Sequence, residues 1–489
     1  MARPYDKAIA DIAHYVFHFK LDQGDETIWE RARMALLDAL ACAIETAATS
    51  LEARTLIRPL IRDTIISGAF QVPGTGFKVD PIEGAFDLGV LIRYLDHNDA
   101  LGGAEWGHPS DNLAAILPVM DWLSRASISG RSGHTGPPVT MATLLEALIK
   151  AYEIQGCYQM QNAFNEYGID HVVLVKLAST AVVSWLMGLT EEQIMASISH
   201  IWMDGHPTRV YRSKTSTTPR KGWAAGDAAR RAVQIALYVR AGQPGAPEAL
   251  TAKPWGFLAR TFGERGFEFS RPFGTWTIRN VFFKTMPVEG HGISAVEAAL
   301  LQRQKIVDQG LSEPAKHIER LELRTSEAAN LIINKAGPLQ NAADRDHCIQ
   351  YVVALSFLKG SAPEATDYSD GSPWAVSAEL AHLRRKISVH PDPQLTRGYL
   401  DLDIKSIGTG LTVVLVDGTV LPEVLVEYPI GHVRDTRTKQ ALQKKFMHNM
   451  AYLFSETEIT HILHAVENMN TPVIHLVDLL ARPVAKGRL

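Results

Sequence analysis

Cysteine is scarce in this sequence: the only three among 489 residues are Cys42, Cys157 and Cys348. They stand too far apart to form a Cys-x-x-Cys zinc or redox site. An iron–sulfur cluster normally needs thiolates that are more closely spaced. The sequence also lacks any Asn-x-Ser/Thr glycosylation site. These absences indicate a reduced, intracellular compartment, and we expect a cytoplasmic protein.

Long uncharged hydrophobic runs are missing as well, so we expect no transmembrane helix. The first six residues, MARPYD, are not followed by the apolar run of a secretory signal, and acidic residues come too early for an organelle presequence. The last three residues, GRL at 487–489, distantly resemble the Ser-Lys-Leu tail of peroxisomal proteins. The alternative is an ordinary frayed terminus.

An excess of positive charge is not present either. The formal net charge is −4 and charged residues make up 21% of the chain, which argues against bulk binding to nucleic acid or to a membrane. Hydrophobic residues make up 46%, an ordinary value for a globular protein, and the length allows two or more domains. Without an EF-hand or P-loop motif, we predict neither a metal nor a cofactor.

Helical hydrophobic patterns fill the first half of the chain. Residues 32–44 and 141–154 carry apolar side chains at the spacing of an amphipathic helix. Residues 172–189 are apolar almost all round, as in a helix buried inside a bundle. Residues 226–240 form another predicted helix, rich in alanine. The first half therefore predicts a large helical domain.

Strand patterns appear after about residue 276. Residues 318–324 alternate polar and apolar, and two valine-rich runs at 411–416 and 420–428 are joined by Asp417-Gly418, a strong hairpin signal. The chain then returns to a helical pattern at 438–469. We predict a mainly α fold: a helical domain built from residues 1–274 and 436–489, with a smaller α+β lid domain of residues 275–435 inserted between them.

One turn-rich segment, residues 95–112, concentrates titratable groups. It holds four acidic side chains and two histidines within eighteen residues. The run His108-Pro109-Ser110-Asp111 is typical of a helix start, which would place His108 where a helix can meet an anion. The alternative is that Ser110 or Asp111 merely caps the helix and His108 is a surface residue.

Three further groups could carry chemistry. His171 directly precedes the predicted buried helix, where a lone histidine is more often structural. Five cations crowd residues 209–221, namely Arg209, Arg212, Lys214, Arg220 and Lys221, and could either form a solvated loop or bind several carboxylates. The run KTMPVEGH at 284–291 falls at the predicted domain junction, where clefts commonly form.

Taken together, these segments resemble the MmgE/PrpD family over nearly the whole chain. The matching stretches, in order, are LDHND from 95, AEWGHPSDN from 104, EIQG from 153, GIDHVVLVKLASTAVV from 168, RKGWAAGDAARRAV from 220, LTAKPWGF from 250, KAGPLQNAADRDHCIQY from 335 and VEYPIGH from 426. Several are long and rich in Trp, His and Gly, so chance is a poor explanation.

The resemblance is closest to the 2-methylcitrate dehydratases of that family. It implies a homodimer with a helical domain and an α+β lid, acting without a metal on a small tricarboxylate. The reaction it implies is dehydration of 2-methylcitrate or a longer 2-alkylcitrate. Because the family also contains cis-aconitate decarboxylase and iminodisuccinate epimerase, a decarboxylase, an epimerase or an inactive carboxylate-binding relative stay open as alternatives.

Carried over position by position, the resemblance predicts the site. Its residues fall on Asp96, His108, His171, Lys221, Lys284 and His291, and we add Arg212 and Tyr211 as substrate-binding residues. We expect the two histidines at 108 and 171 to form the acid–base pair, in either order, with Asp96 orienting or charging a histidine. Lysine and arginine would hold carboxylates and developing negative charge, and His291 would close the site from the lid.

The sequence departs from the family at several of these stretches. Ala100 and Leu101 replace a threonine and a tryptophan, Gly102 and Gly103 replace larger residues, and Gly290 replaces a phenylalanine. If these positions line the pocket, it is roomier and more apolar than one built for a methyl group, which would favour a longer alkyl chain. The alternative is an ordinary 2-methylcitrate enzyme of propionate metabolism in which these changes are neutral.

Overall fold

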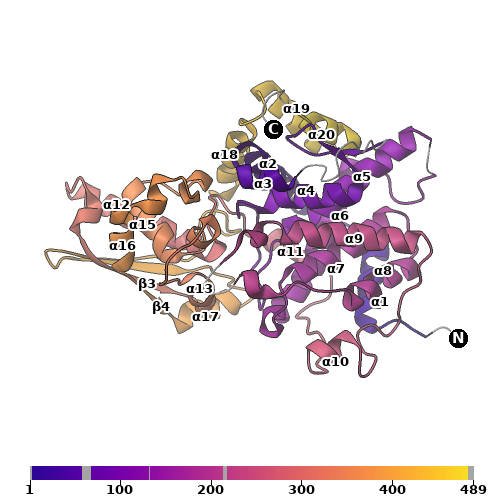
Figure 1. Cartoon of the computed structure of the whole chain (residues 1–489), viewed down its shortest axis with the longest axis horizontal. Coiled ribbons are helices and arrows are strands. Elements are labelled where there is room, and N and C mark those ends of the chain that lie inside the picture. The colour runs from indigo at the N-terminus through magenta and orange to yellow at the C-terminus, as the bar shows by residue number, and fades with distance from the viewer. Residues whose placement is uncertain (1–2, 58–67, 131–132, 213–216, 483–489) are drawn as a thin grey trace.

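The computed structural model describes residues 3–57, 68–130, 133–212 and 217–482. Lys214 and the C-terminal residues 487–489, both named above, lie outside the described residues. The described chain forms a larger, almost entirely helical part and a smaller part that combines helices with a four-stranded sheet, which lie side by side in Figure 1. The mainly α fold predicted from the sequence is therefore confirmed.

The helical part is made from both ends of the described chain, and Figure 1 shows the yellow C-terminal helices beside the indigo and purple N-terminal ones. Its N-terminal elements are α1 Lys7–His18, α2 Glu26–Thr49, α3 Leu51–Leu56, α4 Pro81–Arg93, α5 Leu113–Ile128, α6 Met141–Gln161, α7 Val172–Leu186, α8 Glu191–Met203, α9 Ala224–Arg240, α10 Phe257–Thr261 and α11 Trp276–Asn280. Its C-terminal helices are α18 Thr438–Met450, α19 Glu456–Glu467 and α20 Val473–Leu480. Two short strands, β1 Phe70–Gln71 and β2 Lys78–Val79, pair antiparallel before α4.

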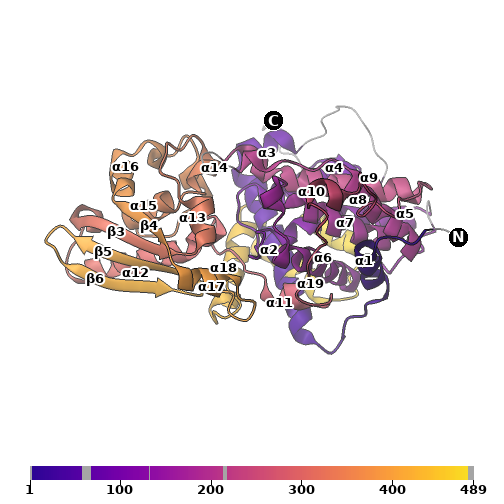
Figure 2. The same ribbon diagram turned by 90° about the horizontal axis from the view of Figure 1, so that it is seen from below.

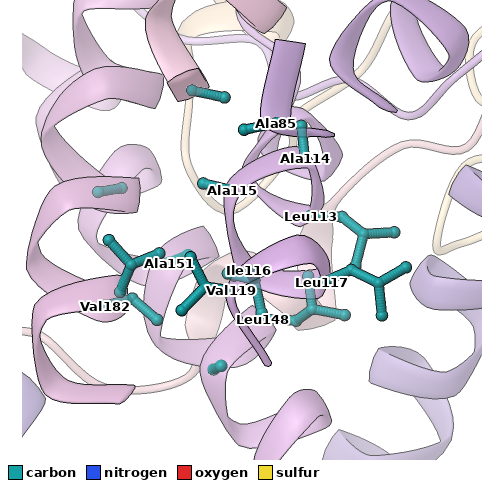
Figure 3. Close-up of a cluster of buried hydrophobic side chains, with 14 of the residues drawn as sticks. Ala85, Leu113, Ala114, Ala115, Ile116, Leu117, Val119, Leu148, Ala151 and Val182 are labelled. Atoms are coloured by element: carbon teal, nitrogen blue, oxygen red, sulfur yellow. The ribbon is translucent and has the colours of Figure 1, made fainter. Parts of the chain in front are cut away.

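Helix α5 lies at the centre of the first hydrophobic core. It packs against α4, α6 and α7, and Figure 3 shows its small side chains Ala114 and Ala115 among those of its neighbours. Helix α7 begins at Val172 as predicted, and every residue in it except Trp185 is buried. The continuous apolar sequence of α7 is thus explained by neighbours on all sides.

Helices α4 and α9 cross at a glycine pair. A Cβ atom added to Gly89 would lie 2.4 Å from the Cα of Gly226, far inside van der Waals contact. We expect Gly89→Ala to force the helices apart and to lower the free energy of unfolding by about 1–3 kcal/mol, measured by urea unfolding. The control is Gly266→Ala, because a Cβ at Gly266 meets nothing within 4 Å. Equal stability of the two variants would contradict the close crossing.

The smaller part surrounds a four-stranded sheet of order β4-β3-β5-β6. Its elements are α12 Ile293–Asp308, β3 Ile318–Thr325, α13 Glu327–Ile333, α14 Ala342–Arg345, α15 Ile349–Lys359, α16 Ala378–Arg385, β4 Ile387–Pro391, α17 Pro393–Leu400, β5 Thr409–Leu415 and β6 Val420–Val426. Strands β3 and β4 are parallel and the other pairs antiparallel. Helix α12 packs on β5 and β6, and α15 packs on α12, so helices cover one face of the sheet, and Figure 2 shows the strands of the other face toward the viewer.

The second hydrophobic core gathers residues of this α+β part and others that precede it in the chain. Ala100 and Trp106 come from the segment before α5, and Phe282 follows α11. Ala100 and Phe282 exchange two backbone hydrogen bonds, of 2.7 and 2.8 Å. Helix α11 itself contacts α2 and α6 of the helical part. The acidic segment predicted to carry chemistry is therefore the place where the two cores meet.

The C-terminal helices differ from the prediction of one helical stretch over 438–469. The chain breaks after Met450, and α19 restarts behind Ser455, whose hydroxyl accepts the Glu458 N–H while the Glu458 carboxylate accepts the Ser455 N–H. This reciprocal capping box fixes a helix start. Helix α20, which no pattern predicted, follows Pro472. Among the described residues, no helix combines the length and apolar character needed to cross a membrane.

Candidate active site

The segment between α4 and α5 folds inward instead of lying on the surface. The Asp99 carboxylate accepts hydrogen bonds from the Ser110 N–H at 3.1 Å, the Ser110 hydroxyl at 2.6 Å and the Tyr152 hydroxyl at 2.7 Å. The Asn98 amide donates to the Ser110 hydroxyl and to Asp111, both at 2.9 Å. These bonds pin the two ends of the segment together. A 3₁₀ turn, η1 (Pro109–Asn112), then leads into α5.

His108 is fixed in one tautomer by this fold. Its Nδ1 lies 2.6 Å from the carbonyl oxygen of Asp99, and because a carbonyl can only accept, Nδ1 carries the proton. The lone pair of the neutral ring is then on Nε2. Burial and the nearby charges of Arg93 and Lys284 lower the pKa of His108 well below its usual value. His108 is therefore an uncharged base at neutral pH.

His171 lies next to His108, at the start of α7. The two ring centroids are 5.6 Å apart and the rings are steeply inclined at 60°. Burial lowers the pKa of His171 to about 3, although the Asp170 carboxylate, 3.5 Å from its Nδ1, acts in the opposite direction. The Asp170 carboxylate is itself held by Arg212 at 2.8 Å. The Nε2 of His171 is buried without a hydrogen-bond partner.

Asp96 is the centre of a buried ion cluster. Its carboxylate lies 2.6 Å from Arg93 and 3.2 Å from Lys221, and it also pairs with Lys284. His347, far away in sequence, contributes its Nε2 at 3.4 Å. Burial alone would raise the pKa of Asp96, but the surrounding positive charges outweigh burial and lower this pKa well below its usual value.

A second carboxylate shares this cluster. Asp346 accepts from Lys221 at 2.7 Å and lies 2.5 Å from Nδ1 of His347. Burial and the charge of Lys221 lower the pKa of His347. Three cations thus face two carboxylates, which leaves one positive charge in excess beside the histidines.

A cavity of about 430 Å³ opens between the helical part and the α+β part, within the usual size range of small-molecule sites. Its wall from the helical side is formed by Arg93, Asp96, Gly103, Ala104, Glu105, Trp106, His108, Asn165, Glu166, His171, Arg209, Arg212 and Thr217. Its wall from the other side is formed by Glu289, Ala328, Leu331, Ile332, His347 and Tyr399. Three arginines and three histidines line this one space beside four carboxylates, and the guanidinium groups can offer paired N–H donors to an anion.

The eight predicted site residues divide evenly between this wall and the layer behind it. On the wall are Asp96, His108, His171 and Arg212. Behind it, Lys221 and Lys284 are bound to Asp96. His291 is held by Glu289 at 3.0 Å and faces the Tyr399 hydroxyl at 3.3 Å. Tyr211 lies with its ring 5.4 Å from the Arg212 guanidinium.

Three residues of the ion cluster, Arg93, Asp346 and His347, were not predicted from the sequence. Arg93 reads as an ordinary basic residue at the end of a helix, although its spacing of three residues from Asp96 was a usable signal. His347 lies in the stretch DRDHC, where the density of charged groups was visible but unassigned. Nothing in the sequence shows that His347 lies beside the Asp96 carboxylate, 251 positions away.

Two expectations need correction. Asp96 was expected to orient or charge a histidine; it orients neither histidine of the pair, since Nδ1 of His108 bonds to the Asp99 carbonyl and His171 faces Asp170, but its charge acts to raise the pKa of His108. Four of the five substituted positions, Ala100, Leu101, Gly102 and Gly290, do not line the cavity; only Gly103 does. A Cβ at Gly290 would lie 2.2 Å from the Trp106 ring, so the indole occupies the space that the missing side chain leaves.

Two clusters in the described part of the chain have ligand atoms close enough together for a metal. Asp96, Asp346 and His347 form one, but the cations bound to them make a divalent ion unfavourable there. His14, His18 and Glu191 form the other, exposed and outside the cavity, with Glu191 2.9 Å from His18 and 3.4 Å from His14. The prediction of no metal ligand overlooked that these two histidines are four residues apart.

The two-core fold, with a cavity lined by arginines and buried histidines at its junction, suits an enzyme that acts on a small anion. The chain belongs to the MmgE/PrpD family. It matches the MmgE/PrpD N-terminal domain over residues 10–270 and the MmgE/PrpD C-terminal domain over residues 286–471. The family resemblance stated from the sequence is confirmed.

Relatives in this family are similar over their whole length. An alkylcitrate dehydratase from a fungal species is 60% identical over 487 residues, covering 100% of this chain and 96% of the relative. A 2-methylcitrate dehydratase-like protein of Aspergillus oryzae is 49% identical, covering 95% of this chain and 92% of the relative. The 2-methylcitrate dehydratase of Escherichia coli is 43% identical, covering 94% and 93%.

Proposed function

We propose that this protein is a carbon–oxygen hydro-lyase that removes water from a 2-alkylcitrate to give the corresponding alkyl-aconitate, without a metal. The observation that carries the proposal is the pair of buried neutral histidines facing one cavity with three arginines. The relatives named as alkylcitrate and 2-methylcitrate dehydratases support it. The α+β part, residues 275–435, would act as the lid of the site.

His108 is the base in this proposal. Its Nε2 takes the proton from the carbon beside a carboxylate. The electron pair left on that carbon and the charge of the neighbouring carboxylate together make a dianion at that position. The tautomer set by Asp99 presents the lone pair to the cavity. The charges of Arg93 and Lys284 oppose protonation of the resting ring. Proton transfer by a placed base typically contributes about 10²–10⁴-fold to the rate.

His171 is the acid. It has a carboxylate beside its Nδ1, Asp170, which favours the protonated ring. Binding of three substrate carboxylates adds further negative charge to the cavity and raises the pKa of nearby histidines. His171 takes up a proton from solvent as the substrate binds, and its Nε2 then gives a proton to the departing hydroxyl. As the C–O bond breaks, the carbon electron pair closes the double bond and water leaves.

The arginine and lysine side chains have different roles toward the negative charge of the substrate. Arg93, Arg209 and Arg212 lie on the wall, and each guanidinium has five N–H donors, more than its single carboxylate partner uses. Their remaining donors hold the substrate carboxylates. Lys221 and Lys284 stand behind Asp96 and stabilise the developing dianion through their charge rather than by contact.

The direct test uses purified full-length protein and synthetic 2-alkylcitrates. Formation of the conjugated double bond is followed in the ultraviolet and the product identified by mass spectrometry. We expect turnover with enzyme that has been treated with a chelator. Carbon dioxide release, change of configuration without water loss, or turnover that a chelator abolishes and a metal restores would each overturn the proposal.

Arg212→Lys tests how the carboxylates are bound. Lysine keeps the charge but loses the two-pronged geometry that matches a carboxylate. We expect KM to rise about 10-fold or more, because a hydrogen bond to a charged group contributes about 1.5–3 kcal/mol. The control is Arg230→Lys on α9, whose pair with Asp227 is partly exposed and outside the cavity. An unchanged KM in Arg212→Lys would remove this residue from the binding set.

We further propose that the protein is a cytoplasmic homodimer, as the family resemblance implies. The three cysteines support a reducing compartment, since Cys42, Cys157 and Cys348 are all unpaired and buried. Light scattering on the eluted peak of a size-exclusion column measures the mass directly. A monomer mass at working concentrations would contradict the dimer.

A further inference from the structure

The cavity has one apolar side, and helix α13 provides it. Ala328, Leu331 and Ile332 all line the cavity, and their spacing of three and four residues places them on one face of the helix. Ala329 and Ile333, on another face of α13, are buried in the second core. Helix α13 is thus fixed to the α+β part by one face and turns a separate apolar face to the substrate space.

Aromatic rings extend this apolar wall. Trp106 and Tyr399 both line the cavity, and their rings stack at an interplanar angle of 16° with centroids 6.5 Å apart. The Tyr399 hydroxyl faces His291, so the polar end of this side chain already has a partner. Helix α13 contacts α17, which carries Tyr399, and the turn η5 (Gly290–Gly292), which carries His291. Helix and rings therefore form one continuous surface.

The charged wall lies on different elements. Arg93, Asp96, His108, His171 and Arg212 all come from the helical part. The polar residues of α13, Glu327 and Asn330, bond to each other at 3.3 Å, and neither lines the cavity. Figures 1 and 2 both place α13 at the end of the α+β part that faces the helical part. The three arginines of the cavity therefore lie on the helical part, and the apolar face of α13 lies on the opposite part, where Glu289 and His347 also line the cavity.

Leu331 is the side chain that this arrangement leaves open. It is 54% exposed at the rim of the cavity, whereas Ala328 and Ile332 are partly buried against the second core. A carboxylate gains nothing from such a surface, because it offers no donor or positive charge. A hydrocarbon chain that leaves the charged face would cover Leu331 and be removed from water.

We propose that the α13 face of Ala328, Leu331 and Ile332 is the subsite for the alkyl chain of the substrate, and that the substrate carries a chain of several methylenes rather than a methyl group. This inference rests on the proposed function and adds the residues that select chain length. Each methylene covered by this wall should raise kcat/KM about fourfold, as expected for full burial of a CH₂ group.

The experiment is a series of 2-alkylcitrates from methyl to hexyl, measured with wild type, Leu331→Asn and Leu301→Asn. Leu301, on α12, is matched to Leu331: it also lies in the α+β part and is 52% exposed, but away from the cavity. We expect the ratio of kcat/KM for hexyl over methyl to fall at least tenfold in Leu331→Asn. The ratio should stay at the wild-type value in Leu301→Asn and recover in Leu331→Met.

A second variant and a binding measurement make the result decisive. Ala328→Trp fills the proposed subsite, so it should lower the hexyl-to-methyl ratio further than Leu331→Asn. Calorimetry with 2-alkyl tricarballylates, which have no hydroxyl to lose, measures binding affinity at the subsite without turnover. Affinity that rises with chain length in wild type but not in Leu331→Asn supports it. A wild-type chain-length slope that persists in both variants overturns the subsite, while a protein that dehydrates no alkylcitrate overturns the proposed function.

Discussion

Asp96→Asn is expected to destabilise this protein by about 3–5 kcal/mol, because removing one member of a buried ion cluster leaves its partners uncompensated. Arg93 is 1% exposed and Lys284 is fully buried, so both cations are largely shielded from bulk water when the carboxylate charge is lost. Asn is the sharpest replacement, since Asp96 has a φ of 54° and Asn tolerates the left-handed region as Asp does. Urea unfolding at neutral pH measures the loss.

The matched control is Asp11→Asn. Asp11 also pairs with a lysine, Lys7, at 2.6 Å, but both side chains are largely exposed. An exposed pair of this kind contributes about 0–1 kcal/mol, so this variant should stay close to wild type. Similar unfolding curves for the two variants would show that the Asp96 cluster is not the buried, charge-compensated unit described here. Loss of activity in Asp96→Asn while folded would follow from the freed cations, which shift the pKa of His108.

Periodicity predicted the long regular elements well. Helix α7 begins at Val172 where its apolar run begins, and β3 spans Ile318–Thr325 where the alternation was seen. In both cases the hydrophobic pattern reflects which faces of the element are buried against its neighbours. The break before α19 had a signal too, the Ser-x-x-Glu of Ser455 and Glu458, but the apolar spacing on both sides masked it. Short helices such as α13 carry too few residues for a period to emerge.

The site was predictable in its residue types and not in its geometry. Histidine, aspartate and cations in turn-rich segments indicated a polyanion site, and four of the eight predicted residues line the cavity. Sequence could not show which atom each side chain faces. The tautomer of His108 depends on a carbonyl nine residues away, and the position of Lys284 depends on a carboxylate 188 residues away. Such contacts are set by the packing of whole helices.

His108→Gln is expected to lower kcat by about 10²–10⁴-fold, the usual contribution of one placed base, while the protein stays folded. His171→Asn should cause a similar loss of dehydration. The control is His206→Asn: burial also lowers the pKa of His206 to about 3, but this residue does not line the cavity. Near-wild-type turnover in both His108→Gln and His171→Asn would remove the pair from the mechanism.

Deuterium exchange separates the two roles, because in the proposed order the carbon proton leaves before the hydroxyl. His171→Asn keeps the base, so it should still exchange the carbon-bound hydrogen of the substrate with solvent deuterium, detected by mass spectrometry, while forming little product. His108→Gln should neither exchange nor dehydrate. The opposite result, in which His108→Gln exchanges the hydrogen and His171→Asn does not, would assign the base to His171. That reversal would also mean that the carbonyl of Asp99, which fixes the proton on Nδ1 of His108, does not set the direction of proton flow.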